Sequence, residues 1–271
     1  MKQTINFTKM HGAGNDYIYV YLPTNPVTNP EKLSVEWSRQ HFGVGSDGLI
    51  LIDKSDVADF SMRIFNNDGS EAMMCGNGVR CVAKFVRDHQ LTDKDEIAVD
   101  TLSGIKRIKV HEENGVVVSG TVDMGEPLLE NKSQYTGECP DGIDGTYVCM
   151  GNPHFVVFVD DIEEIDLPVI GKSLEHSPVF PERCNIEFAQ LVAPDTLRTR
   201  VWERGSGITM ACGTGACATA VAAVTTGRCS RSVKIQMDGG LLAIDWDETS
   251  NHVFLTGPAT SVFEGQITID Q

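Results

Sequence analysis

The chain has 271 residues and a formal net charge of −16 at neutral pH, with 41% hydrophobic and 22% charged residues. This composition is typical of a soluble globular protein with a sizeable core, large enough for one domain or two. So acidic a balance argues against nucleic acid and anionic membrane surfaces as partners, because both require a basic footprint.

The N-terminus and the cysteines predict a cytoplasmic protein that does not enter the membrane. Residues 1–9 lack the apolar segment of an export signal, and the longest apolar runs are far shorter than a membrane span. In a reducing cytoplasm the eight cysteines are expected to be free thiols. They include no Cys-x-x-Cys pair and the seven histidines are scattered, so we expect no metal site.

The first seventy residues predict strands joined by turns, with one short helix. Residues 5–22 have the pattern of two strands around a turn at 11–16, and a loop with three prolines leads to a helix at 31–41. Residues 49–52 and 62–65 predict two further strands.

Residues 73–81 place Cys75 directly before a glycine-rich helix start, with the sequence MMCGNGVRC. Apolar residues at 79–86 predict a helix that runs to about His89. Glycines leave the N–H groups of a helix start open to an anion, and a thiol placed there is expected to ionise more easily than a free one. A buried cysteine beside a tight turn would give the same pattern, so this stretch alone leaves both interpretations open.

After this helix, residues 97–101, 105–110 and 116–122 predict strands, and the second half of the chain then repeats the first. Asn15 recurs as Asn152 and Cys75-Gly76-Asn77-Gly78 recurs as Cys212-Gly213-Thr214-Gly215, both at an offset of 137 (152 − 15 and 212 − 75). We place a one-residue deletion within the helix, because Cys81 then aligns with Cys217 at an offset of 136.

The repeat predicts two homologous halves, residues 1–118 and 119–257, each a set of strands around one helix. Residues 258–271 are left over, and we expect them to form a strand that returns to the first half. The second helix, residues 216–224, has no charged side chain, so it should be fully buried, and Gly227 can end it.

Two thiols at equivalent helix starts suit a reaction that is symmetric about one carbon. If a pseudo-twofold axis brings Cys75 and Cys212 to face each other across a cleft, a thiolate can remove a proton from one face and a thiol can return one to the other. Epimerisation or racemisation beside a carboxylate is such a reaction. The amides of the two glycine-rich turns would hold that carboxylate and stabilise the developing charge.

The chain resembles the diaminopimelate epimerase family through motifs spread over nearly its whole length. These motifs are Met10-His11-Gly12-Ala13-Gly14-Asn15-Asp16, Phe65-Asn66-Asn67-Asp68-Gly69-Ser70-Glu71, Cys75-Gly76-Asn77-Gly78, Met150-Gly151-Asn152-Pro153-His154, Asn185, Glu203-Arg204-Gly205 and Cys212-Gly213-Thr214-Gly215.

The resemblance implies an α/β (α+β) fold of two pseudo-twofold-related halves, each a mainly antiparallel sheet wrapped around a central buried helix. It implies a cytoplasmic, homodimeric isomerase that needs neither pyridoxal phosphate nor another cofactor. Such an enzyme interconverts LL- and meso-diaminopimelate in lysine and peptidoglycan-precursor biosynthesis.

The family pattern also assigns residues. It makes Cys75 and Cys212 the acid/base pair, and it places substrate contacts at Asn15, Asn66, Gly76, Asn77, Asn152, Asn185, Glu203, Arg204, Gly213 and Thr214. Arg204 suits the distal carboxylate of the substrate and Glu203 its distal ammonium. His154 and Glu203 would lie near enough to tune the thiols. The chain departs from some members at Gly48, where they have glutamine, so we expect no substrate contact there.

Two other functions remain open. A proline-type amino-acid racemase has a similar fold but favours Cys-Gly-His-Gly at the first cysteine and aspartate in place of Glu203. A non-catalytic amino-acid-binding protein on the same scaffold would not need a thiol at both helix starts. The remaining cysteines are interpreted as structural: Cys81, Cys139, Cys149, Cys184, Cys217 and Cys229.

Overall fold

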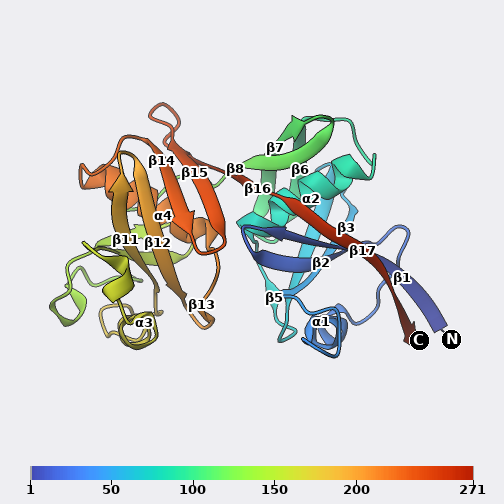
Figure 1. Cartoon of the computed structure of the whole chain (residues 1–271), viewed down its shortest axis with the longest axis horizontal. Helices are drawn as coiled ribbons and strands as arrows, with labels where there is room; N and C mark the ends of the chain where they lie inside the picture. The colour runs from blue at the N-terminus through green and yellow to red at the C-terminus, as the bar shows by residue number, and fades with distance from the viewer. Residues whose placement is uncertain (1, 271) are drawn as a thin grey trace. The chain divides into compact units, whose positions relative to one another are not determined.

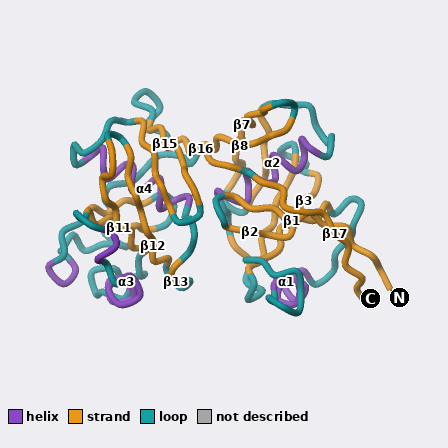
Figure 2. The backbone as a smooth tube through the Cα atoms, viewed as in Figure 1, coloured by secondary structure: helices purple, strands orange, loops and turns teal. Residues whose placement is uncertain are grey.

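Strands dominate both parts of the chain in the computed structural model, which describes residues 2–270. The chain divides into two units, Met1–Val122 with Gly257–Gln271, and Asp123–Thr256. The first boundary therefore lies four residues beyond the predicted one (122 − 118). Figures 1 and 2 show each unit as strands that surround a helix.

The strands of the first unit pair mainly antiparallel. They are β1 (Lys2–Gly12), β2 (Asn15–Tyr21), β3 (Gly48–Lys54), β4 (Phe60–Asn66), β5 (Glu71–Ala72), β6 (Glu96–Thr101), β7 (Gly104–Glu113) and β8 (Val116–Asp123). Pairs β1–β2, β3–β4, β4–β5, β6–β7 and β7–β8 are antiparallel. The pairs β2–β3 and β4–β6 are parallel.

The C-terminal strand belongs to the first unit. Strand β17 (Thr260–Asp270) runs antiparallel to β1, from the pair His11 and Thr260 to the pair Lys2 and Asp270. The two ends of the described chain therefore lie side by side (Figure 1).

The second unit repeats this pairing strand for strand. Its strands are β9 (Thr146–Cys149), β10 (Pro153–Phe158), β11 (Asn185–Ala193), β12 (Thr196–Glu203), β13 (Gly207–Ile208), β14 (Ser232–Met237), β15 (Gly240–Trp246) and β16 (Val253–Pro258). Pairs β10–β11 and β12–β14 are parallel, and the other neighbours are antiparallel. The predicted repeat of mainly antiparallel sheets around a helix is confirmed in each unit.

The helices keep the offset of 137 to their last residues. Helices α1 (Pro30–Ser38) and α2 (Gly76–Asp88) correspond to α3 (Leu167–Glu175) and α4 (Gly213–Thr225), with starts and ends 137 apart (167 − 30, 175 − 38, 213 − 76 and 225 − 88). Strands β6 and β14 are offset by 136 (232 − 96).

The predicted deletion within the helix is therefore wrong, and the counterpart of Cys81 is Ala218, not Cys217. Left-handed residues follow both helices at the same offset, Gln90 with φ 56° and Gly227 with φ 71°. The missing residue falls after them, in the connection to β14. A deletion inside a helix would rotate every later side chain by about 100° around the axis, whereas a connection absorbs it locally.

Helix α4 is buried as predicted. Its residues from Ala216 to Ala223 are at most 1% exposed. Gly227 ends the helix: its N–H donates to Val224 O at 3.0 Å and the N–H of Arg228 donates to Ala223 O at 2.8 Å, which is the Schellman pattern. Helix α2 is buried from Gly76 to Val86 although this stretch includes Arg80 and Lys84.

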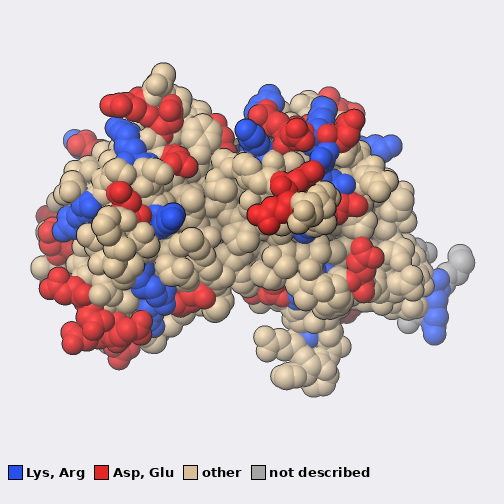
Figure 3. Space-filling model, turned by 45° about the horizontal axis from the view of Figure 1, so that its top comes forward, with Lys and Arg blue, Asp and Glu red and all other residues tan. Residues whose placement is uncertain are grey.

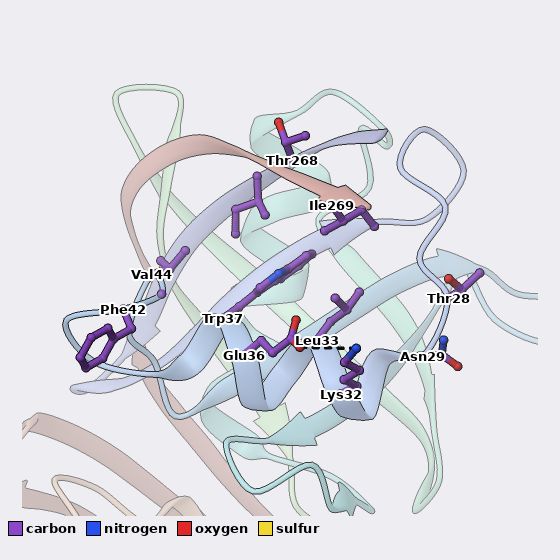
Figure 4. A pocket seen from close by; sticks show the side chains of 12 residues that line it. Thr28, Asn29, Lys32, Leu33, Glu36, Trp37, Phe42, Val44, Thr268 and Ile269 are labelled. Carbon is purple, nitrogen blue, oxygen red and sulfur yellow. Dashed lines mark ion pairs between the residues drawn. The ribbon is translucent and has the colours of Figure 1, made fainter. Parts of the chain in front are cut away.

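Helix α1 covers part of the first unit's sheet. Its Leu33 and Trp37 pack into a core with Ile5, Leu49 and Phe65. Figure 4 shows both side chains pointing toward the sheet, while Lys32 and Glu36 pair on the outer side. A hollow of about 670 Å³ lies between α1 and the end of β17, and none of the predicted site residues lines it.

Acidic side chains outnumber basic ones in this chain, 38 to 22. On the face that Figure 3 shows, basic side chains lie among acidic ones and form no broad basic patch. Within residues 2–270, no helix is both long enough and apolar enough to cross a membrane.

Gly48 has no room for a side chain, because a Cβ there would lie 2.1 Å from Phe65 O. We expect Gly48→Ala to lower the free energy of unfolding by about 1–3 kcal/mol or more, since strand β4 must move. Urea unfolding followed by circular dichroism measures this. The control is Gly115→Asn, a turn position whose counterpart Asn251 holds a φ of 60°; its cost should stay below about 1 kcal/mol. Equal midpoints for Gly48→Ala and wild type would contradict the prediction.

Candidate active site

Cys75 is the N-cap residue of helix α2 in the first unit. The N–H of Gly78, in the first turn, donates to Cys75 Sγ at 3.3 Å. The thiol in turn donates to Asn15 Oδ1 at 3.2 Å. A Cβ on Gly78 would lie 2.8 Å from Ile50 Cδ1, so the glycine allows strand β3 to pass close without moving that side chain. Close approach of strand β3 to the helix start thus sets the position of this half-buried thiol.

Asp47 orients the amide of Asn15. Asn15 Nδ2 and the Asp16 N–H both donate to Asp47 Oδ2, at 2.8 and 2.9 Å. Since the amide nitrogen faces a carboxylate, the oxygen must be the end that faces Cys75. Burial raises the pKa of Asp47, although the hydrogen bonds from Asp16 and Asn15 oppose the shift.

The glycine-rich turn after Cys75 is held from inside the helix by Arg80. This side chain is fully buried, and its Nη1 donates to Gly76 O at 3.0 Å. Its Nη2 donates to Asn77 Oδ1 at 2.9 Å, so the Asn77 side chain supports the turn. The predicted contribution of Gly76 and Asn77 is through their N–H groups, which lie in the first turn where the intrahelical ladder supplies no acceptor.

Asn66 ends strand β4 and pairs in register with Gly48. Its Nδ2 donates to Ser70 Oγ at 3.0 Å, and its backbone O accepts from Ser34 Oγ at 2.8 Å. The side chain is half-buried, whereas that of the neighbouring Asn67 is exposed.

Cys212 is the corresponding N-cap of helix α4 in the second unit, and it is only 7% exposed. Its Sγ lies 3.4 Å from Thr214 Oγ1. Burial raises the pKa of this thiol well above its usual value, and the carboxylates of Glu203 and Glu187 raise it further. Desolvation and two negative charges therefore act at Cys212 against the ionisation that a helix start favours.

Glu203 ends strand β12 close to Cys212. Its Oε1 accepts a hydrogen bond from Thr209 Oγ1. Burial raises the pKa of Glu203, while the Thr209 hydrogen bond and His154 lower it. The charge of Glu203 in turn raises the pKa of Cys212.

His154 on strand β10 is fully buried between an acid and an amide. Its Nδ1 lies 2.7 Å from Glu187 Oε1, and its Nε2 lies 3.1 Å from Asn152 Oδ1. Asn152 is the counterpart of Asn15, so each unit holds this asparagine through an acid, directly in the first and through a histidine in the second.

Asn185 and Arg204 join the ends of two strands. Asn185 Nδ2 donates to Pro153 O at 2.7 Å, and Asn185 Oδ1 accepts from the Arg204 N–H at 2.9 Å. Arg204 Nη1 donates to Glu182 O at 2.9 Å. These contacts fix the backbone beside Glu203. Gly213 and Thr214 form the first turn of α4, as Gly76 and Asn77 do in α2.

Glu187 is the residue that the sequence interpretation missed. It is the third residue of strand β11 and is fully buried. Its signal was available, since a glutamate interrupts the apolar residues Ile186 and Phe188 and aligns at 137 with Ile50 (187 − 50). In residues 2–270 we find no group of three or more His, Cys, Asp or Glu side chains arranged to hold a metal ion.

The surroundings of Cys212 predict a titration. Alkylation of Cys212 by iodoacetamide, followed by mass spectrometry across pH, should have a midpoint above the value of about 8.5 for a free cysteine. Replacing a nearby negative charge with a neutral amide, in Glu203→Gln, should lower that midpoint. The exposed Glu163→Gln, also in the second unit, serves as the control. A midpoint that stays or rises in Glu203→Gln would contradict this account.

Comparison with known proteins identifies the family. The family model for diaminopimelate epimerase matches residues 7–129 and 146–262. A diaminopimelate epimerase of Bacteroides thetaiotaomicron is 59% identical over 267 residues, which cover 98% of this chain and 99% of that protein.

Solved structures share the fold at low sequence identity. A PhzF-family phenazine biosynthesis protein of Bacillus anthracis has a TM-score of 0.73 at 18% identity, covering 98% of this chain and 99% of its own. A hydroxyproline epimerase of Agrobacterium vitis has a TM-score of 0.70 at 14% identity, covering 99% and 93%. With a family model that matches most of its length and a relative of 59% identity, this chain belongs to the diaminopimelate epimerase family.

Proposed function

We propose that this chain is a cofactor-independent epimerase that uses Cys75 and Cys212 to interconvert LL-diaminopimelate and meso-diaminopimelate. Such an enzyme serves lysine and peptidoglycan-precursor biosynthesis in the cytoplasm. The observation that carries the proposal is the thiol that stands as N-cap at the start of the central helix in both units. Family membership supports the substrate.

The proposed reaction moves two protons at one carbon. A thiolate takes the proton from Cα, breaking the C–H bond and forming S–H, while the electron pair spreads into the adjacent carboxylate. The other thiol then gives its proton to the opposite face of Cα and becomes a thiolate. The N–H groups of Gly76, Asn77, Gly213 and Thr214 stabilise the charge on that carboxylate, because first-turn amides carry a partial positive charge.

The distal end of the substrate is assigned to charged partners. Arg204 binds the distal carboxylate and Glu203 the distal ammonium, and asparagines supply donors and acceptors to the remaining groups. These asparagines are Asn15, Asn66, Asn152 and Asn185. For Asn15 and Asn152 the contacts described above already determine which end of each amide is engaged by the protein.

The alternatives find less support. A proline-type racemase shares the fold, but the hydroxyproline epimerase is only 14% identical, and Asn77 and Glu203 stand where that family favours histidine and aspartate. A non-catalytic amino-acid-binding protein would not need a cysteine at the N-cap position of both central helices. Of the three functions, only diaminopimelate epimerase is supported by a relative of 59% identity.

Exchange of the Cα proton tests the reaction. In heavy water without added cofactor, LL-diaminopimelate should gain one deuterium at Cα as it epimerises, and proline run in parallel should gain none. Mass spectrometry and NMR measure both. Deuterium in proline alone would favour the racemase, and binding of diaminopimelate without exchange in either compound would favour the binder.

Serine variants test the thiols. We expect Cys75→Ser and Cys212→Ser each to lower kcat by roughly 100-fold to 10,000-fold, the usual contribution of an acid/base group. Serine is a good N-cap, so both variants should fold normally. The exposed Cys139→Ser is the matched control and should keep full activity. Wild-type turnover in either of the first two variants would exclude the two-thiol mechanism.

The homodimer is also a proposal, supported by the family resemblance. One chain has a mass of 29.6 kDa, so sedimentation equilibrium at micromolar concentration should give about twice that mass. A mass of one chain that persists at all concentrations tested would show a monomer.

A further inference from the structure

The two helix starts differ at one equivalent position. Ile50 on β3 and Glu187 on β11 are 137 residues apart, and each packs against the glycine in the first turn of the neighbouring central helix. A Cβ on Gly78 would lie 2.8 Å from Ile50 Cδ1, and a Cβ on Gly215 would lie 2.5 Å from Glu187 Oε1. Where the first unit places a methyl group, the second places a carboxyl oxygen.

A second position adds to this difference. Arg80 lies buried in α2 with its guanidinium on Gly76 O, in the turn that follows Cys75. The residue at the same place in α4 is Cys217 (80 + 137), which is neutral when protonated. The helix start of Cys75 therefore has a buried cation, and that of Cys212 has the acids Glu187 and Glu203.

Glu187 is connected to the site through His154. An amide oxygen can only accept, so the Nε2–H of His154 donates to Asn152 Oδ1. His154 Nδ1 shares a hydrogen bond with Oε1 of Glu187. Its second oxygen, Oε2, is buried and has no hydrogen-bond partner among the described residues. A buried carboxyl oxygen without a partner is costly for stability, which points to a role beyond packing.

The same contact orients Asn152. Because its Oδ1 faces His154, its Nδ2 is the end left for other partners. In the first unit the polarity is opposite, since Asn15 Nδ2 faces Asp47 and Oδ1 faces Cys75. Two asparagines at equivalent places thus present opposite ends of their amides.

We propose that Glu187 is a positioning residue that makes the two thiols unequal: it fixes the amide of Asn152 through His154, and with Glu203 it keeps the proton on Cys212, so that Cys75 is the first of the two to ionise. The proposal rests on the two-thiol mechanism above.

The charges around each thiol support this order. The pKa of Cys212 is raised by burial, by Glu203 from β12 and by Glu187 from β11, in that order, and His154 from β10 contacts Glu187. Around Cys75 lie Arg80, Tyr19 and Cys81, and Asp47 stands behind Asn15. The Asn15 oxygen opposes ionisation of Cys75, but a neutral dipole acts more weakly than two carboxylates.

The test compares the alkylation of each cysteine with iodoacetamide across pH, read separately by mass spectrometry. We expect Cys75 to have the lower midpoint in the wild type. In Glu187→Gln the Cys212 midpoint should fall by at least about half a pH unit, roughly a threefold change in its ionisation constant, while that of Cys75 stays. Glu187→Asp should restore most of the shift because it keeps the charge. Midpoints are compared, not rates, because the two thiols differ in exposure.

A matched control and a kinetic readout complete the experiment. Glu175→Gln removes another buried carboxylate of the second unit, one that binds Trp202, Arg183 and the Gly205 N–H, and should leave the Cys212 midpoint unchanged. In kcat/KM against pH, the alkaline limb, which reports loss of the Cys212 proton from the free enzyme, should move to lower pH in Glu187→Gln.

Two results would overturn the proposal: a wild-type midpoint for Cys212 at or below that of Cys75, or an unchanged Cys212 midpoint in Glu187→Gln. The wild-type order remains decisive if the glutamine variant fails to fold. Failure of the two-thiol mechanism is a separate outcome, seen as retained turnover in the serine variants.

Discussion

The position of the cysteine at each central helix start depends on close packing between a strand and the first turn of a buried helix. A Cβ at Gly78 or Gly215 would lie under 3 Å from the side-chain end of Ile50 or Glu187, so the two glycines allow β3 and β11 to pass close to the helix starts. The cysteine at each N-cap has an extended backbone. A larger residue at either glycine would force the facing side chain to move.

The central helix of each unit is buried over most of its length. Each is surrounded by strands that pair in the same order, so most of its surface meets other side chains. The buried surface of α4 consists mainly of small uncharged side chains, namely alanine, valine and threonine. α2 instead buries Arg80 and Lys84, whose charged ends are bound by backbone oxygens such as Gly76 O and Val117 O. The deletion between the two repeats lies outside the helices for the same reason, since a shift within one would expose its buried face.

Internal duplication produces two similar scaffolds, but it does not make the two thiols chemically equal. A scaffold repeated at the backbone level still carries different side chains, and electrostatic effects in a buried site depend on those side chains. The exchange of Ile50 for Glu187, and of Arg80 for Cys217, changes the charge beside the helix start while leaving the pairing of the strands intact. A reaction that needs a thiolate and a thiol at the same time benefits from this difference.

Much of the molecule follows from local sequence signals. The glycine-rich turns, the uncharged second helix, the stop at Gly227 and the repeat of Cys75 as Cys212 were enough to predict the duplicated fold and the two candidate thiols. Family motifs extended this to Asn15, Asn152, Glu203 and Arg204. These signals are local because turns, caps and periodicity are determined by residues close together in the chain.

Other features were decided only by tertiary structure. Matching Cys81 with Cys217 predicts a deletion inside the helix. The equal lengths of α2 and α4 instead place it in the connection that follows each helix. Sequence also predicted easy ionisation at a helix start, whereas burial and two carboxylates from other strands raise the pKa of Cys212. Asp47 orients the Asn15 amide from 32 positions along the chain, and Glu187 contacts His154 from 33 positions along it. Desolvation and charge act through space, so their sum at a thiol is set by the packed fold and not by the thiol's neighbours along the chain.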